Sequence, residues 1–239
     1  MNQYLHVQAH RGASLEKKEN SLESVRRAVE LGVDSIEIDI HLLRDGALIV
    51  FHDFFLPPSA TPKFICDQNL SAMRSFEAPT LTEVCELVKS LSSRLLWLDL
   101  EVKYLEGNPN SPEREKLVDS VLRTVSLSWE LNRTRFRSFD WKILKLFHKT
   151  VSTFQTIPLL GRDEEEFSKV LELQPEWIAP YVGTLNDKTV SWAKRAGVKL
   201  MPYTVNSPSE WKKLTDWGVQ GITTDDPRGL LKFLGREAS

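Results

Sequence analysis

Apolar stretches of two kinds alternate along the chain, and their spacing predicts its secondary structure. The short apolar runs that predict strands cover residues 6–9, 35–42, 48–51, 95–103, 135–139, 153–160, 177–182, 199–205 and 221–224. Longer stretches with apolar residues at helical spacing lie between most of these runs, and several end at a glycine, such as Gly32, Gly197 and Gly218. Strands that alternate with helices in this way predict a parallel sheet.

The number of strand–helix units favours one architecture. About eight units in 239 residues predict a (β/α)₈ TIM barrel, formed by a single domain over residues 1–239. A doubly wound sheet is the alternative, but it would more naturally carry a glycine-rich nucleotide loop after the first strand, and Arg11-Gly12-Ala13-Ser14 is not such a loop. The rhythm breaks after His52, where residues 53–80 predict a short irregular insertion.

Local signals set the expected boundaries around this break. Asp45-Gly46 predicts a tight turn, so the strands on either side of it form a hairpin or a bent pair. The first helix is expected to begin at the capping residue Asn20, with Glu23 three positions later. Thr82 is a weak cap for the helix that follows the insertion.

The strand over residues 35–42 carries charge where packing is expected. Its isoleucines alternate with Glu37, Asp39 and His41, so two carboxylates and an imidazole share one face. Buried acids are costly unless they are paired, protonated or bound to a cation. This conflict between burial and charge is typical of a functional site.

Ionisable residues also end other early strands, and a barrel brings the carboxyl ends of its strands together. The candidates are His10, Arg11, Glu37, Asp39, His52, Glu101 and Lys103. Three carboxylates without cysteine favour a hard divalent cation, Mg²⁺ or Ca²⁺, over zinc. Two histidines suit general acid and base work, and Arg11 and Lys103 offer contacts to an anion. The set therefore predicts phosphoryl chemistry.

The same residues also have structural interpretations. The three acids could pair with the two bases as internal salt bridges, although three acids against two bases favour a metal. His41 could be a hydrogen-bond partner behind the site. Asp99, one step deeper on its strand than Glu101, is expected to be a satisfied core acid. His6 and His148 lack such a context and are expected to be structural or on the surface.

Composition narrows the expected partners and location. The formal net charge of -2 and the pI of about 6.2 give no basic footprint for nucleic acid. No apolar run approaches the roughly 20 residues of a membrane span, so no membrane insertion is expected. Cys66 and Cys85 have no metal or disulfide spacing, and the residues after Met1 are not expected to act as a signal peptide. These features predict a cytoplasmic protein; they do not indicate its oligomeric state.

Taken in order, the motifs resemble those of the glycerophosphodiester phosphodiesterase family. The segments that carry the resemblance are His10-Arg11-Gly12, Glu19-Asn20, Glu37-Ile38-Asp39, His52-Asp53, Glu101-Val102-Lys103, Tyr203-Thr204-Val205-Asn206 and Gly218-Val219-Gln220-Gly221-Ile222-Thr223-Thr224-Asp225-Asp226-Pro227. The ordered set spans almost the whole chain. The resemblance implies a TIM barrel that uses a divalent metal to hydrolyse glycerophosphodiesters, which are small-molecule phosphodiesters. The products would be an alcohol and glycerol 3-phosphate, which would place the enzyme in glycerol and lipid metabolism.

The resemblance also implies roles for individual residues. These are His10 and His52 as the acid/base pair, Glu37, Asp39 and Glu101 as metal ligands, Arg11 and Lys103 as phosphate contacts, Tyr203 in the substrate pocket, and Glu19 and Asn20 in support. The chain departs from the family at Lys18, where the family has proline, and at Tyr203, where it usually has tryptophan. Asn20 could equally be a helix cap.

Two other functions stay open at this point. One is a lysophospholipase D or a phospholipase-like lyase on the same barrel, in which Phe54, Phe55 and Leu56 beside His52 would hold an acyl chain. The other is a catalytically inactive barrel that binds phosphodiesters. The retained histidines and carboxylates argue against the second function.

Overall fold

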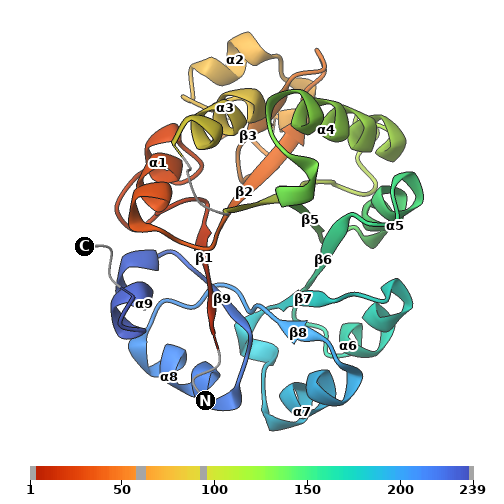
Figure 1. The fold of residues 1–239 in the computed structure, drawn as a ribbon. Coiled ribbons are helices and arrows are strands. Elements are labelled where there is room, and N and C mark those ends of the chain that lie inside the picture. Colours follow the sequence, from red (N-terminus) through yellow and green to blue (C-terminus); the bar gives the residue numbers. More distant parts are fainter. Residues whose placement is uncertain (1–3, 58–62, 92–95, 237–239) are drawn as a thin grey trace.

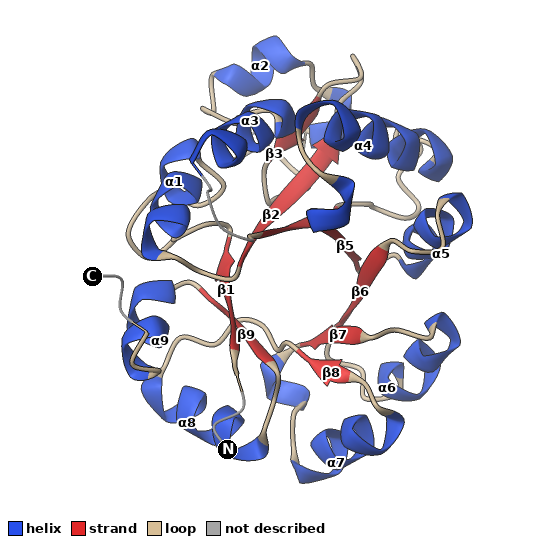
Figure 2. Ribbon diagram, viewed as in Figure 1, coloured by secondary structure: helices blue, strands red, loops and turns tan. Residues whose placement is uncertain are grey.

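Eight parallel strands form a nearly closed barrel in the computed structural model, with helices around its outside (Figures 1 and 2). The structure describes residues 4–57, 63–91 and 96–236. The barrel strands are β1 (His6–His10), β2 (Ser35–Leu42), β4 (Trp97–Val102), β5 (Thr134–Ser138), β6 (Gln155–Leu160), β7 (Trp177–Pro180), β8 (Lys199–Leu200) and β9 (Gly221–Thr224). The predicted TIM barrel is therefore confirmed; the predicted strand residue Leu95 lies outside the described ranges.

The barrel closes between β8 and β9 without a regular ladder. The hydrogen-bonded order is β8-β7-β6-β5-β4-β2-β1-β9, and single backbone bonds join the two ends, such as Val205 N–H to the Thr223 carbonyl at 3.0 Å. The run over 199–205 was expected to form one strand, but β8 has two residues because Pro202 has no N–H for a ladder. Tyr203 resumes the pairing through a single bridge to Tyr181.

The helices that cover the barrel begin at caps that differ in part from the expected ones. They are α1 (Leu22–Leu31), α3 (Leu81–Leu91), α4 (Arg114–Ser128), α5 (Trp141–Thr150), α6 (Glu166–Lys169), α7 (Asp187–Ala196), α8 (Pro208–Trp217) and α9 (Pro227–Phe233). Short 3₁₀ turns follow or separate them, η2 (Leu131–Arg133), η3 (Val170–Leu173) and η4 (Val182–Thr184). The cap of α1 is Ser21 rather than Asn20, and Thr80 rather than Thr82 accepts the Glu83 N–H in α3.

The insertion after His52 is more regular than the sequence indicated. Strand β3 (Leu48–Val50) pairs antiparallel with β2, so the predicted hairpin is present. The segment expected to be irregular contains η1 (Ile65–Asp67) and the helix α2 (Leu70–Arg74), which Asn69 caps. Five helical residues are too few to show a period in the sequence. A small apolar core anchors the insertion beside β3, formed by Leu43, Ile49, Ile65, Met73 and Ala78.

Paired polar groups fill the barrel interior on the amino-terminal side of Glu101 and His10. Asp99 accepts a hydrogen bond from Arg135 Nε at 2.7 Å and another from the Gln8 amide, which confirms the expectation of a satisfied core acid. His6 Nε2 lies 2.9 Å from Ser35 Oγ inside the same network. Cys66 and Cys85 are free thiols.

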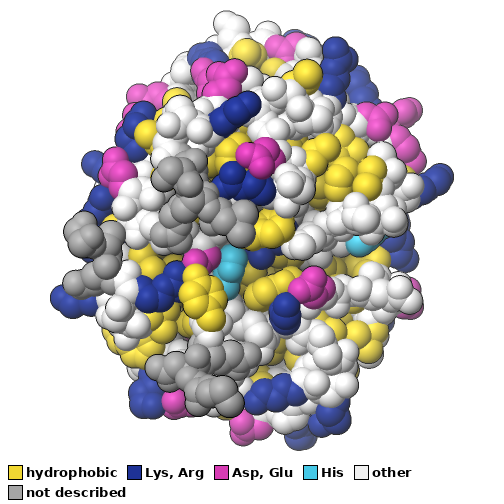
Figure 3. All heavy atoms as spheres, viewed as in Figure 1, with side chains coloured by type: hydrophobic (Ala, Val, Ile, Leu, Met, Phe, Trp, Pro, Cys, Tyr) yellow, Lys and Arg dark blue, Asp and Glu magenta, His cyan; other side chains and the backbone are white. Residues whose placement is uncertain are grey.

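The outer surface carries charges of both signs. Figure 3 shows acidic and basic side chains interspersed over one end of the barrel. Across the described ranges, the helices are too short or too polar to span a bilayer.

Candidate active site

The three carboxylates expected to bind metal meet at the carboxyl ends of the neighbouring strands β2 and β4. Asp39 is the register partner of Glu101, and Glu37 precedes Asp39 on the same face. One oxygen of each carboxylate lies within 4.8 Å of the other two, and all three residues are buried. Three acids so close together repel one another when ionised, which is the situation that a hard divalent cation relieves.

Two basic residues already contact these acids. Lys103 Nζ lies 2.8 Å from one Asp39 oxygen and 2.6 Å from a Glu101 oxygen, and Arg11 Nε lies 3.2 Å from the other Asp39 oxygen. Burial alone would raise the pKa of Asp39, but Lys103 and Arg11 outweigh it and lower this pKa to about 2. The salt-bridge interpretation therefore describes Asp39 well.

Glu37 is compensated far less than Asp39. Its Oε2 accepts the Arg11 backbone N–H at 3.1 Å and lies 4.0 Å from His10 Nε2. Its Oε1 is buried and finds no hydrogen-bond partner among the residues that the structure describes. Burial and the nearby Asp39 charge raise the pKa of Glu37 to about 7. An orphaned carboxylate oxygen beside two further acids fits the oxygen donor set that Mg²⁺ or Ca²⁺ prefers.

His10, at the end of β1, is oriented by a carboxylate from the far end of the chain. Its Nδ1 lies 2.6 Å from Asp225 Oδ1, and Asp225 also accepts hydrogen bonds from Ser14 and Asn206. Burial would raise the pKa of Asp225, but the hydrogen bond and charge of His10 and the hydrogen bonds from Asn206 and Ser14 together outweigh it and lower this pKa to about 2. An ionised Asp225 fixes the proton on Nδ1, which leaves Nε2 to exchange protons. Asp225 belongs to the closing motif over residues 218–227, but no local pattern in the sequence predicts its role.

His52, which follows β3, has the same kind of partner. Its Nδ1 lies 2.8 Å from Asp53 Oδ1, and its side chain is 36% exposed, compared with 15% for His10. The backbone brings it beside the acids, because Phe51 N–H donates to the Asp39 carbonyl at 3.0 Å. Both predicted histidines thus reach the carboxyl end of the barrel with a carboxylate on Nδ1.

The two supporting residues hold the acids and Arg11 in place. Arg11 Nη1 donates to Glu19 at 2.9 Å. Asn20 Nδ2 donates to Asp39 at 2.8 Å, and the Asp39 backbone N–H donates back to Asn20 at 3.3 Å. Asn20 adopts φ of +54°, a left-handed conformation that asparagine tolerates, and this turns its side chain toward Asp39. Of the two interpretations of Asn20, the structure therefore supports a contact in the site.

Tyr203 follows β8 and packs against the small apolar cluster that contains Ile157, Leu159 and Met201. Its hydroxyl donates to the Leu160 carbonyl at 2.9 Å, and its ring meets Phe139 edge-on with centroids 6.1 Å apart. Burial raises the pKa of this phenol. The ring rather than the hydroxyl of Tyr203 is thus available to a substrate, and its predicted place in the pocket wall stays a prediction.

Solved structures share this barrel. One is a glycerophosphodiester phosphodiesterase from Parabacteroides distasonis, which aligns with 98% of this chain and 98% of its own chain, with a TM-score of 0.85 and 24% sequence identity. This chain also covers 97% of an Oleispira antarctica phosphodiesterase solved with the product sn-glycerol-3-phosphate, over 97% of its own length, with a TM-score of 0.84 and 23% identity. The fold and the acidic cluster define a TIM barrel with a candidate cation site at the carboxyl ends of its strands.

Sequence comparison identifies the family. Residues 10–228 match the model of the Glycerophosphoryl diester phosphodiesterase family. The chain is 27% identical to the glycerophosphodiester phosphodiesterase of Caldanaerobacter subterraneus subsp. tengcongensis, over 95% of this chain and 97% of that one. It is 23% identical to lysophospholipase D of Mus musculus, over 95% and 85% of the two chains. The chain belongs to the glycerophosphoryl diester phosphodiesterase family, which confirms the resemblance seen in the motifs and the predicted class of enzyme.

Proposed function

We propose that this protein hydrolyses glycerophosphodiesters to glycerol 3-phosphate and an alcohol, using one divalent cation and the acid/base pair His10 and His52. The observation that carries the proposal is the buried cluster of Glu37, Asp39 and Glu101, with His10 Nε2 only 4.0 Å from Glu37. Membership of the family and its product-bound structural neighbour support the same reaction. The cytoplasmic location and the place in glycerol and lipid metabolism stay predictions.

The acids would bind the phosphate through the cation, and the basic residues would attract it directly. Glu37, Asp39 and Glu101 would hold Mg²⁺ or Ca²⁺, whose positive charge would offset the charge of the phosphate oxygens. Arg11 and Lys103 contribute two further positive charges beside these acids. In this arrangement both basic side chains stay anchored to Asp39 while they attract the phosphate.

The two histidines move the protons. Asp225 and Asp53 occupy the Nδ1 sides of His10 and His52, so the Nε2 atoms exchange protons with the substrate. One imidazole takes a proton from the nucleophile, and the other gives a proton to the leaving alkoxide. The nucleophile is either water or the neighbouring hydroxyl of the glycerol, in which case a cyclic phosphate forms before glycerol 3-phosphate.

Phosphorus NMR of the protein with glycerophosphocholine tests this proposal directly. We expect glycerol 3-phosphate to appear with Mg²⁺ or Ca²⁺ and its formation to stop when EDTA is added. A cyclic phosphate that appears first would identify the substrate hydroxyl as the nucleophile. Equal turnover in EDTA would overturn the metal requirement, and no turnover of any glycerophosphodiester would overturn the reaction.

A lysolipid is the second candidate substrate, because exposed apolar side chains follow several strand ends. Leu15 is 67% exposed, Phe139 52% and Phe55 41%. Apolar residues that face water around a polar site suit an acyl chain. A higher kcat/KM for lysophosphatidylcholine than for glycerophosphocholine would favour this candidate. Phe139→Ser should then lower the first value and leave the second unchanged.

A further inference from the structure

One buried arginine beside the acidic cluster has no part in the chemistry above. Arg137 lies on β5 and is only 1% exposed. It is the register partner of Glu101, which is in turn the register partner of Asp39. Neighbouring strands lie about 5 Å apart, and register partners on parallel strands point to the same side of the sheet. Arg137 therefore enters the barrel interior one strand away from the candidate cation site.

The guanidinium of Arg137 lacks the charged partner that a buried cation normally has. Among the residues that the structure describes, its one side-chain hydrogen bond runs from Nη1 to the amide oxygen of Gln8. Its Nε has no partner, and none of the described carboxylates forms an ion pair with it. Gln8 is neutral, and its oxygen also accepts the Thr223 hydroxyl at 2.7 Å. A buried charge with only a neutral amide beside it is costly, so a further group is expected to offset it.

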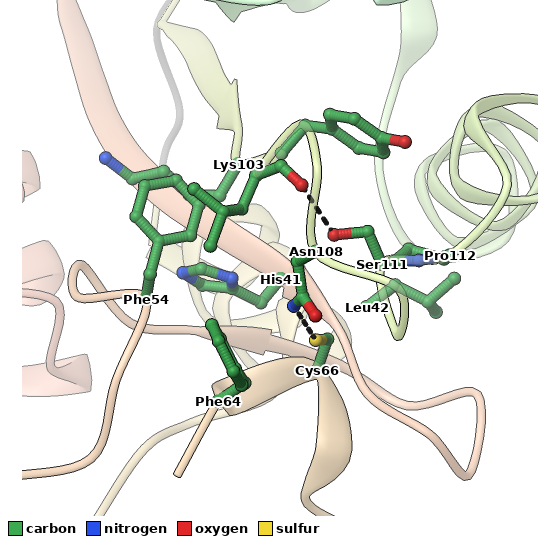
Figure 4. Close-up of a pocket in the computed structure, with 11 residues that line it drawn as sticks. His41, Leu42, Phe54, Phe64, Cys66, Lys103, Asn108, Ser111 and Pro112 are labelled. Atoms are coloured by element: carbon green, nitrogen blue, oxygen red, sulfur yellow. Dashed lines mark hydrogen bonds between the residues drawn. The ribbon is translucent and has the colours of Figure 1, made fainter. Parts of the chain in front are cut away.

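The two basic residues described above, Arg11 and Lys103, already have partners within the protein. Both contact Asp39, at 3.2 Å and 2.8 Å. Lys103 Nζ also lies 5.9 Å from the centre of the Phe54 ring, and Figure 4 shows these two side chains next to each other. Because Arg137 has no carboxylate partner among the described residues, its charge is the least compensated of the three.

An uncompensated charge in this place acts on whatever occupies the site. Charges interact over several ångström inside a protein, because little water is present there to screen them. The pKa of Glu37 reflects this: burial and Asp39 raise it, and the charge of Arg137 acts in the opposite direction. A positive charge one strand away from the three acids repels a cation that they hold and attracts a phosphate group beside that cation.

We propose that Arg137 sets the balance between the two ligands of the site: its charge weakens the binding of the divalent cation and strengthens the binding of the phosphate group. This inference rests on the proposed function, which supplies both ligands. A phosphate monoester carries more negative charge than a diester near neutral pH, so Arg137 favours the product glycerol 3-phosphate more than the substrate. Without Arg137 the acids would hold the cation more tightly and the site would hold the phosphate less tightly.

Two substitutions separate the charge of Arg137 from its shape. Arg137→Met removes the charge and keeps much of the length, whereas Arg137→Lys keeps the charge without the guanidinium. Calorimetry at pH 8 would measure Mn²⁺ binding to the metal-free protein and then glycerol 3-phosphate binding at saturating Mn²⁺. In Arg137→Met we expect the Mn²⁺ affinity to rise about tenfold and the glycerol 3-phosphate affinity to fall about tenfold. In Arg137→Lys both affinities should stay within about threefold of the natural protein, because the charge remains.

Arg123→Met is the matched control, since Arg123 is exposed on α4 and water screens its charge. It should change neither affinity. If Arg137→Met does not fold, Arg137→Gln decides the matter, because it removes the same charge and keeps a donor for Gln8. Unchanged affinity for both ligands in the folded neutral variant would overturn the inference. An equal loss of glycerol 3-phosphate binding in Arg137→Met and Arg137→Lys, with unchanged Mn²⁺ affinity, would also overturn it, since the guanidinium would then act by direct contact.

The natural protein distinguishes this inference from the proposed function. If it binds neither Mn²⁺ nor glycerol 3-phosphate, the cation site of the proposed function is wrong, and the inference falls with it. If it binds both and hydrolyses glycerophosphocholine only with a metal, while Arg137→Met has the same two affinities, the proposed function stands and only the role of Arg137 is overturned.

Discussion

The two sides of the barrel interior are filled in opposite ways. Strands β1, β2, β4 and β5 form a charged side, with the inward residues Gln8, His10, Glu37, Asp39, Asp99, Glu101, Arg135 and Arg137. Strands β6, β7 and β8 form an apolar side, with Ile157, Leu159, Ala179 and Met201 packed against Trp177 and Tyr203. The candidate active site lies on the charged side, at the carboxyl ends of its strands.

The difference separates activity from stability within one barrel. On the charged side several buried charges are held by a neighbour, as Arg135 holds Asp99 and as Lys103 holds Asp39, whereas Glu37 is left with an unpaired oxygen among the described residues. Such groups are costly to bury, and their geometry suits recognition of a charged substrate. The apolar side has no such cost and packs as an ordinary core. Substitutions on the charged side should mainly change activity, and those on the apolar side should mainly change stability.

The largest expected effect concerns the two histidines. His10→Ala and His52→Ala should each lower kcat by about 10²–10⁴-fold, the usual contribution of a positioned acid or base. His148→Ala is the matched control, since that ring lies on α5 outside the barrel, 2.7 Å from Thr156. Steady-state kinetics with glycerophosphocholine would measure all three. A kcat above a tenth of normal for either His10→Ala or His52→Ala would contradict the assignment.

The next effect tests the apolar side. Ile157 is fully buried there, so Ile157→Ala should lower the free energy of unfolding by about 2–5 kcal/mol through the lost contacts and the cavity left behind. Its kcat should stay within a few-fold of normal at a temperature where the variant is folded. Urea unfolding and kinetics on one sample would check both. A large loss of kcat with unchanged stability would show that this wall takes part in the chemistry.

The sequence predicted which residues lie on the charged side better than it predicted the long-range contacts between them. The alternation of Glu37, Asp39 and His41 with isoleucines determined their shared face, since a strand has a period of two. The contact between His10 and Asp225 depends on the closure of the barrel across 215 positions, and no local pattern reports it. His41 Nε2 is buried without a hydrogen-bond partner among the described residues, and no local pattern reports this either.

Local signals also failed where neighbouring residues had equal chemistry. Asn20 and Ser21 are both good caps, and the sequence alone cannot choose between them. The backbone decides: Ser21 is extended, as a cap must be, whereas Asn20 is left-handed and bonds to Asp39. The short helix α2 was missed because its five residues show no helical period.

A smaller effect on stability is expected within the acidic cluster, at Glu37. In metal-free protein the pKa of Glu37 is raised from 4.5 to about 7. The folded state then holds this proton more tightly than the unfolded state does, so the free energy of unfolding falls as the pH rises from 4.5 to 7. Glu37→Gln should therefore stabilise the metal-free protein at pH 8 by roughly 1–3 kcal/mol and make no difference below pH 4.5. Urea unfolding in EDTA at both pH values would measure this. An equal gain at both would contradict it.

Asp39→Asn provides the control of opposite sign. The pKa of Asp39 is lowered from 3.8 to about 2, so its ionised form stabilises the fold at all pH values above 3.8, and this contribution is lost as the pH falls through 2. Removing the charge leaves Lys103 and Arg11 without their shared partner, so Asp39→Asn should destabilise the metal-free protein at pH 8. Stabilisation by both substitutions would mean that the cluster acts as one repulsive group.

The smallest expected effect concerns Tyr203, which packs on the apolar side and is predicted to line the substrate pocket. Its hydroxyl donates to the Leu160 carbonyl, which also accepts the Tyr181 N–H at 2.9 Å, so Tyr203→Phe leaves that carbonyl satisfied. The free energy of unfolding should fall by about 0.5–1 kcal/mol, and kcat/KM for glycerophosphocholine should stay within about twofold, because the ring remains. A tenfold loss of kcat/KM would show that the hydroxyl turns from Leu160 to the substrate, and the boundary of the charged side would then extend to β8.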